Sequence, residues 1–157
     1  MTTQSLIDEL TTARRELFEL IDRISPDSMT TPGLVGEWSG REVIAHLGYW
    51  AGNAVEVIQA VEEGRADEVD EAKPPTDEVN ETVARVARDT DLATVRKREA
   101  ATVDVLIERL GRMDPGLLAA RLPDGDALAE GISGDAGQHY RQHAEELRRV
   151  LTEGARG

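Results

Sequence analysis

Residues 132–151 read ISGDAGQHYRQHAEELRRVL, and their pattern predicts the last helix of the chain. The apolar residues recur in steps typical of one helix face, at Ile132, Ala136, Leu147 and Val150. Ser133 is the expected N-terminal cap. His139 and His143 fall in the gap of the apolar stripe, and residues four apart share a helix face. Both imidazoles are therefore expected to point toward the interior.

The chain contains three histidines, and the third, His46, lies in an earlier helical stretch. It interrupts an apolar stripe made of Val43, Leu47, Trp50, Ala54 and Val57. Because all three histidines are expected to face inward, we predict a tris-histidine metal site. Neutral imidazole binds zinc, nickel, copper or iron. Three protein ligands leave one coordination position open for water or substrate, which is the arrangement of catalytic zinc.

Two acidic residues are candidate partners of these histidines. Glu42 lies one turn before His46, and Asp135 lies one turn before His139. Either carboxylate could accept the second ring N–H and fix the tautomer of its histidine. The alternative is ordinary acidic charge in the first turn of a helix, which the helix dipole favours.

Two aromatic residues beside the histidines have an open role. Trp50 and Tyr140 are candidates for the walls of a pocket at the metal site, or else members of the core.

The rest of the chain predicts three further helical stretches. Residues 4–24 are amphipathic, and residues 40–61 follow a predicted capping box of Ser39 and Glu42. A third stretch covers residues 76–110, with a break at 89–91 where Asp91 can cap a second segment. Its expected apolar stripe is Val95, Ala101, Val105, Leu106 and Leu110. Short extra helical turns are expected in the connectors, one of them ending at Ala120, and residues 122–131 are expected to form a loop.

Four long helices with such connectors favour an all-α four-helix bundle, whose core is a usual place for metal sites. A length of 157 residues favours a single domain over residues 1–157.

The composition indicates which partners and which cellular compartment to expect. The formal net charge of −13 argues against nucleic acid and against anionic lipid surfaces. The absence of cysteine excludes disulfides, thiolate metal sites and cysteine nucleophiles. The start of the chain does not resemble a signal peptide, and no apolar run approaches the roughly 20 residues of a membrane span. A cytoplasmic protein with no membrane partner is therefore expected.

The segment from Gly36 to Leu47, GEWSGREVIAHL, resembles the second-helix signature of the DinB-like superfamily. That superfamily includes mycothiol-dependent maleylpyruvate isomerases and bacillithiol transferases. His139-x-x-x-His143 is similar to the ligand pair on the last helix of the superfamily, and the resemblance covers nearly the whole chain. It implies a bundle with up-up-down-down topology and a divalent metal, with zinc or nickel as first candidates, held by three side chains.

One position departs from the mycothiol isomerase branch, whose last helix typically has Glu-x-x-x-His. This chain has His139 at the first of those positions, which is closer to the DinB and thiol-transferase pattern. The departure argues against maleylpyruvate isomerisation itself and leaves the metal site intact.

These inferences together favour a metal-dependent enzyme that activates a low-molecular-weight thiol for transfer to, or isomerisation of, a small electrophile. Because the chain lacks cysteine, the thiol must come from outside, and the Arg-rich composition makes mycothiol the first candidate. One alternative is a metal-activated detoxifying hydrolase, and another is a non-catalytic, stress-associated metal-binding bundle. A homodimer is also expected, since homodimers are the commonest oligomers.

Overall fold

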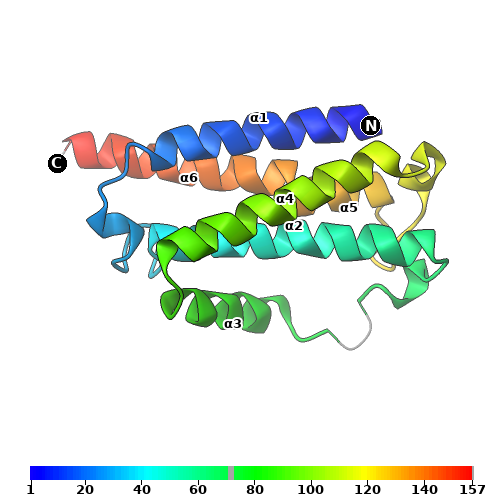
Figure 1. Ribbon diagram of the computed structural model, residues 1–157, viewed down its shortest axis with the longest axis horizontal. Helices are drawn as coiled ribbons and strands as arrows, with labels where there is room; N and C mark the ends of the chain where they lie inside the picture. Colours follow the sequence, from blue (N-terminus) through cyan, green and yellow to red (C-terminus); the bar gives the residue numbers. More distant parts are fainter. Residues whose placement is uncertain (71–72, 157) are drawn as a thin grey trace.

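The computed structural model describes residues 1–70 and 73–156, and these residues form helices and connectors with no strand (Figure 1). The α-helices are α1 (Thr3–Ile21), α2 (Gly40–Glu62), α3 (Thr76–Arg88), α4 (Leu92–Arg112), α5 (Leu128–Asp135) and α6 (Gly137–Arg156). Short 3₁₀ helices lie in the connectors at Asp27–Met29, Ala66–Glu68 and Pro115–Ala119. The predicted all-α bundle with extra helical turns is confirmed. Across the described residues, no helix has both the length and the apolarity needed to cross a membrane.

The direction of the helices differs from the expected up-up-down-down order. Gly48 lies against Glu99, and Arg109 donates to Glu62 farther along, so α2 and α4 run parallel. α1 and α6 lie side by side and run the other way (Figure 1). The long helices therefore follow an up-down-down-up order. The reason is α3, which carries the chain back along α2 to the end where α2 began, so that α4 starts there too (Figure 1).

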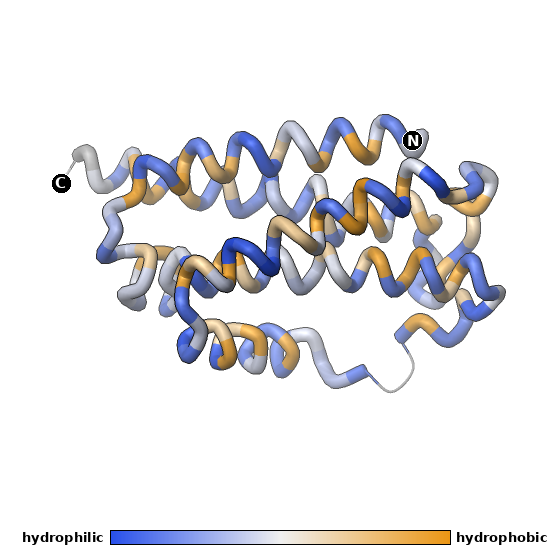
Figure 2. Tube along the Cα trace, in the orientation of Figure 1, coloured by the Kyte–Doolittle hydropathy of each residue, from blue (hydrophilic) through white to orange (hydrophobic). Residues whose placement is uncertain are grey.

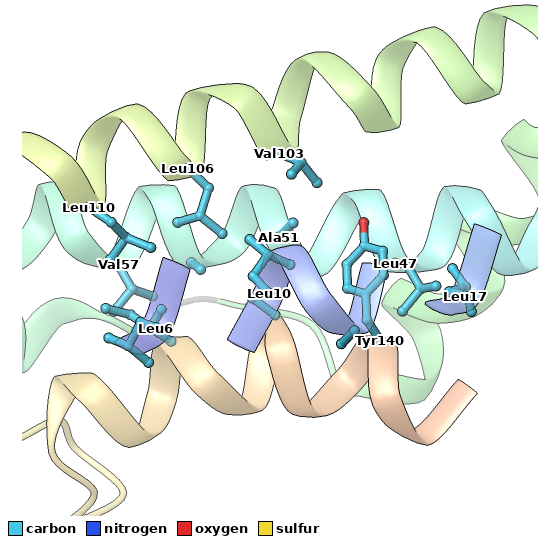
Figure 3. Close-up of a cluster of buried hydrophobic side chains, with 14 of the residues drawn as sticks. Leu6, Leu10, Leu17, Leu47, Ala51, Val57, Val103, Leu106, Leu110 and Tyr140 are labelled. Carbon is cyan, nitrogen blue, oxygen red and sulfur yellow. The ribbon is translucent and has the colours of Figure 1, made fainter. Parts of the chain in front are cut away.

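Each long helix is amphipathic, and Figure 2 shows apolar and hydrophilic residues alternating along the helices as a bundle requires. The buried side chains meet between α1, α2, α4 and α6, where Leu10, Leu47 and Leu106 lie close together with Tyr140 (Figure 3). The amphipathic pattern expected for α1 is confirmed, because its apolar residues Leu6, Leu10, Ala13, Leu17, Leu20 and Ile21 are buried.

α2 and α4 approach closely because α2 has glycines where it meets α4. A Cβ atom added at Gly48 would lie 3.2 Å from the Glu99 Cα atom, whereas one added at Gly52 would meet only the Thr102 methyl group at 3.4 Å. The two glycines let the helix axes come together, as small residues do at helix contacts.

The α4 stripe was predicted partly wrongly, because its inward position at 99 is a glutamate. Val95, Glu99, Val103, Leu106 and Leu110 are buried, while Ala101 and Val105 face outward. The predicted break before α4 is confirmed, and Asp91 caps this helix by accepting a hydrogen bond from the Thr94 amide (3.0 Å).

The predicted last helix is two helices. It begins earlier than expected, at Leu128, and breaks at Ala136, whose φ and ψ are −124° and −96°. Gly131, Gly134 and Gly137 weaken helix propensity by up to about 1 kcal/mol each, which permits the break. Ser133 is inside α5 and is not a cap.

Glu9 of α1 holds the α5–α6 break in place. Its carboxylate accepts a hydrogen bond from the Ser133 hydroxyl (2.7 Å) and occupies the space that a side chain at Gly137 would need. The negative charge lies at the N-terminus of α6, where the helix dipole favours it. α1 thereby sets the position from which α6 presents His139 and His143.

Candidate metal centre

The structure brings together all three histidines that the sequence singled out. His46 projects from α2, and His139 and His143 project from successive turns of α6. One ligand atom from each lies within 4.8 Å of the others. The Nε2 atoms of His46 and His139 are 2.8 Å apart, and the three ring centroids are separated by 4.6 to 5.0 Å.

Burial keeps two of these imidazoles neutral. Burial, together with the neighbouring His139 and His143, lowers the pKa of His46 to about 3, while the Asn80 side chain acts in the opposite direction. Burial also lowers the pKa of His139 to about 4, helped by His143 and opposed by the backbone carbonyl of Asp135. Both rings are therefore neutral at pH 7, which is the form that binds a metal.

A carboxylate orients the third imidazole. The Nδ1 atom of His143 lies 3.0 Å from Glu146 Oε2, one turn farther along α6. Nε2 is the ring nitrogen that remains for a ligand. Metal-bound histidines usually donate their other N–H to such a carboxylate. Glu146 was not among the predicted site residues, although its spacing of three residues after His143 is a signal that could have identified it.

The donor set fits a divalent transition metal. Two nitrogens bound tetrahedrally to zinc at its usual bond length are roughly 3.4 Å apart. The Nε2 atoms of His46 and His139 are closer than this, at 2.8 Å, and all three ligand atoms lie within 4.8 Å of one another. Small ring movements would therefore suffice for ligation. The Nδ1 atoms of His46 and His139 are buried and have no hydrogen-bond partner among the described residues. Buried polar atoms without partners are rare, and here they belong to the rings whose Nε2 atoms converge.

Two candidate residues have other roles. The Glu42 carboxylate accepts a hydrogen bond from Ser39 Oγ (2.9 Å) and pairs with Arg88 (3.4 Å), so it does not hold His46. This contact also replaces the expected capping box, because the Ser39 side chain bonds no backbone amide. Tyr140 is fully buried in the core and donates to Glu99 Oε1 (2.7 Å), so it forms no pocket wall.

The Tyr140 hydroxyl belongs to a buried polar cluster beside the triad. Glu99 also accepts two hydrogen bonds from Arg14, at 2.6 and 2.8 Å. Burial raises the pKa of Tyr140 well above its ordinary value, with a further rise from Glu99, so the hydroxyl stays protonated and donates. The cluster joins α1, α4 and α6 and fixes the rotation of α6 about its axis.

Trp50 follows His46 by four residues on α2, and Asp135 ends α5 four residues before His139. The Trp50 Nε1–H donates to Asn80 Oδ1 (2.8 Å), and Trp50 borders a cavity of about 270 Å³ under the α2–α3 connector. The Asp135 carboxylate accepts a hydrogen bond from Asn53 Nδ2 (2.7 Å) and does not bond the His139 ring. Burial raises the pKa of Asp135 to about 6. Asn53 and Asn80 carried no sequence signal that could have identified them.

Solved structures share this fold. The crystal structure of an uncharacterised protein from Escherichia coli UTI89 has a TM-score of 0.79 and 13% identity, covering 98% of this chain and 95% of that chain. The crystal structure of the colibactin self-resistance protein ClbS in complex with a dsDNA has a TM-score of 0.78 and 15% identity, covering 96% of each chain. At such low identity the likeness shows the fold alone.

The ClbS structure corrects one expectation. The net charge argues against nucleic acid, but a protein with this fold is in complex with duplex DNA in that structure. Net charge is a property of the whole chain, whereas phosphate binding depends on where the basic residues lie. The exclusion of nucleic acid therefore does not stand.

The sequence itself matches the mycothiol maleylpyruvate isomerase N-terminal domain over residues 10–134. The matched range includes His46 and ends before His139 and His143. A comparison with curated proteins finds no match.

Proposed function

The chain belongs to the mycothiol maleylpyruvate isomerase N-terminal domain family, and on that premise we propose that it is a divalent-metal-dependent enzyme of thiol chemistry. In this proposal His46, His139 and His143 hold the metal, with zinc or nickel as first candidates. The enzyme transfers a low-molecular-weight thiol of the mycothiol type to a small electrophile. The chain has no cysteine, so the thiol is a second substrate.

The observation that carries the proposal is the convergence of three imidazoles from two helices, with one ligand atom of each within 4.8 Å of the others. A divalent ion bound there would lower the pKa of a coordinated thiol and hold it as the thiolate. The protein supplies rings that stay unprotonated at neutral pH, because burial lowers the pKa of His46 and His139. Glu146 holds the His143 ring with Nε2 toward the other two histidines.

The first test is metal content. Protein purified without a metal-binding tag should contain about one divalent ion per chain by elemental analysis, and His143→Ala should lose stoichiometric binding. Gln142→Ala is the matched control, because Gln142 is the exposed neighbour on α6. Both variants should keep the helical circular-dichroism spectrum of the parent protein. A His143→Ala variant with unchanged metal content would show that the three histidines do not bind the metal.

The reaction is tested by following an electrophile, such as a maleimide or an epoxide, with and without added thiol. Consumption that needs both the thiol and the metal supports thiol transfer. Metal-dependent consumption without thiol would instead identify a hydrolase, in which water attacks. Full metal loading without turnover of any electrophile would favour the non-catalytic binding protein.

Duplex DNA binding is a second candidate, favoured by the ClbS complex and by one stretch of this chain. Arg96, Lys97 and Arg98 are consecutive and exposed near the start of α4. Phosphate contacts by these residues would make DNA affinity fall steeply with salt. Fluorescence anisotropy with a labelled duplex at low salt tests this candidate. If the chain binds DNA, Lys97→Gln should reduce the salt dependence of the affinity by about one counterion. No rise in anisotropy on adding the protein would reject DNA binding.

A further inference from the structure

A groove on a different face of α2 from His46 is not used by the proposed function. It has a volume of about 300 Å³ and is bordered by α2, α3 and α4. Gly48 and Tyr49 contribute from α2, Val83 and Val86 from α3, and Arg98 from α4. A volume of this size is at the lower end of the range for small-molecule sites, so the occupant must be small.

The groove exists because α3 and α4 diverge from the turn that joins them. Figure 1 shows α3 lying along α2 while α4 slants away from α3. At this level Gly48 lets α4 approach α2 closely, and the backbone there lines the groove. The floor is therefore backbone and small side chains, and the walls are largely apolar.

The apolar rim is unusually exposed for a folded chain. Val86 is 54% exposed and Tyr49 is 44% exposed, and they are two of the four large apolar residues that are exposed in the described part of the chain. A single exposed apolar residue needs no explanation, but two that line one concave surface mark a binding site.

The groove lining carries two charged side chains, Arg98 and Glu99, and the Glu99 carboxylate is already paired with Arg14. Residues 85–98 carry five basic and two acidic side chains, in a chain whose net charge is −13. Arg98 lines the groove and takes part in none of the ion pairs that the described residues form.

A second guanidinium, that of Arg41, lies behind Thr90 and is not itself part of the groove lining. Arg41 donates from Nη1 to the backbone carbonyl of Thr90 (3.2 Å), and Thr90 lines the groove. The Arg41 Nε–H is buried and has no acceptor among residues 1–70 and 73–156. An anionic group in the groove would meet the Arg98 guanidinium, while the Glu99 carboxylate is held by Arg14 and Tyr140.

We propose that this groove binds a small amphipathic carboxylate. The apolar chain or ring contacts Val83, Val86 and Tyr49, and the carboxylate pairs with Arg98. Arginine suits this role because its planar guanidinium binds a carboxylate through two hydrogen bonds.

Sodium octanoate is the probe, titrated into the full-length, isotopically labelled protein and followed by amide chemical shifts. Saturable shifts are expected at Gly48, Val83 and Thr90, with a dissociation constant in the low millimolar range or tighter. Arg98→Gln should weaken binding about fivefold or more, since a charge-assisted hydrogen bond is lost. Lys97→Gln is the matched control, because Lys97 is the exposed adjacent cation that does not line the groove, and it should change affinity less than about twofold. Acetate and 1-octanol, which lack the tail and the charge respectively, should both bind more weakly.

Three outcomes would overturn the proposal. One is the absence of saturable shifts in the groove, and another is equal weakening by Arg98→Gln and Lys97→Gln. The third is a dimer by light scattering that Val86→Glu dissociates, which would assign the groove to a second copy of the chain. Val86 is exposed, so Val86→Glu is expected to fold, and loss of octanoate binding in a folded monomer would support the site.

Discussion

Glu146 orients a proposed ligand without being one. Its carboxylate lies 3.0 Å from His143 Nδ1, and the rotation of that ring depends on this contact. Glu146→Ala should therefore weaken metal affinity by about tenfold, as is typical when a carboxylate behind a histidine ligand is removed. The matched control is Glu145→Ala, which removes an exposed neighbouring carboxylate. Competition against a chelator at pH 7.5 measures both, and equal affinities would mean that Glu146 has no orienting role.

The buried carboxylate of Glu99 depends on a single arginine. Arg14 supplies two hydrogen bonds to it and is itself only half-buried. Arg14→Met leaves Glu99 without its charged partner, and the free energy of unfolding should fall by about 2–3 kcal/mol, somewhat below the usual cost for a fully buried pair. Arg15→Met, at an exposed neighbour on α1, should stay within about 0.5 kcal/mol of the parent protein. Urea unfolding gives both values. Similar stabilities of the Arg14→Met and Arg15→Met variants would show that water replaces Arg14 as the partner of Glu99.

Sequence alone identified the three ligand candidates because each histidine interrupts an apolar stripe. It could not identify Glu99 as a core residue, because a glutamate at an inward position is indistinguishable from one on a solvated face until Arg14 and Tyr140 are placed beside it. The partners that decide such positions are distant in the chain, 85 residues away in the case of Arg14.

At the scale of helices, the α2–α4 contact offers a matched pair of glycines. A Cβ atom at Gly48 would press on the backbone of Glu99 at 3.2 Å, but one at Gly52 would make an ordinary contact at 3.4 Å. Alanine gains up to about 1 kcal/mol of helix propensity at either position. Gly48→Ala should therefore be less stable than Gly52→Ala by about 1–2 kcal/mol, because only the first substitution overpacks the interface. Thermal unfolding of the two variants measures the difference, and equal melting temperatures would contradict close packing at Gly48.

A helix boundary could be predicted where neighbouring residues in the sequence determine it. It could not be predicted where contacts between distant parts of the chain determine it. Asp91 caps α4 through its own neighbour Thr94, so the break before α4 could be read directly. The break at Ala136 depends on Glu9, which bonds Ser133 across 124 residues of sequence. Three glycines in that region permit the break, but glycine alone does not say where the chain turns.

At the scale of the whole molecule, the bundle class followed from amphipathic periodicity, but the helix directions did not. Periodicity reports which face of a helix is buried and carries no information about direction. The short α3 reverses the chain between α2 and α4, and it was predicted as the first part of one interrupted stretch. The convergence of the histidines is insensitive to this error, because α2 and α6 are antiparallel neighbours in either order.

The stability of the metal-free protein should depend on pH through the same histidines. The folded-state pKa values of His46 and His139 are about 3 and about 4, whereas an unfolded histidine titrates near 6.5. Below about pH 6.5 the unfolded chain therefore takes up protons that the folded protein does not, and the free energy of unfolding falls. Each histidine contributes up to about 1.4 kcal/mol per pH unit down to its folded pKa.

Asp135 acts in the opposite direction over part of this range. Burial raises its folded pKa from 3.8 to about 6, so between these values the folded protein keeps a proton that the unfolded chain releases. Acidification then stabilises through Asp135 while it destabilises through both histidines, leaving a net loss of about 1.4 kcal/mol per unit from pH 6 to 4. Urea unfolding in chelator at pH 7, 6, 5 and 4.5 measures the slope. Asp135→Asn should steepen it, and the double substitution His46→Asn with His139→Asn should abolish the loss. A parent protein equally stable at pH 7 and pH 4.5 would mean that these imidazoles are not buried in the neutral form.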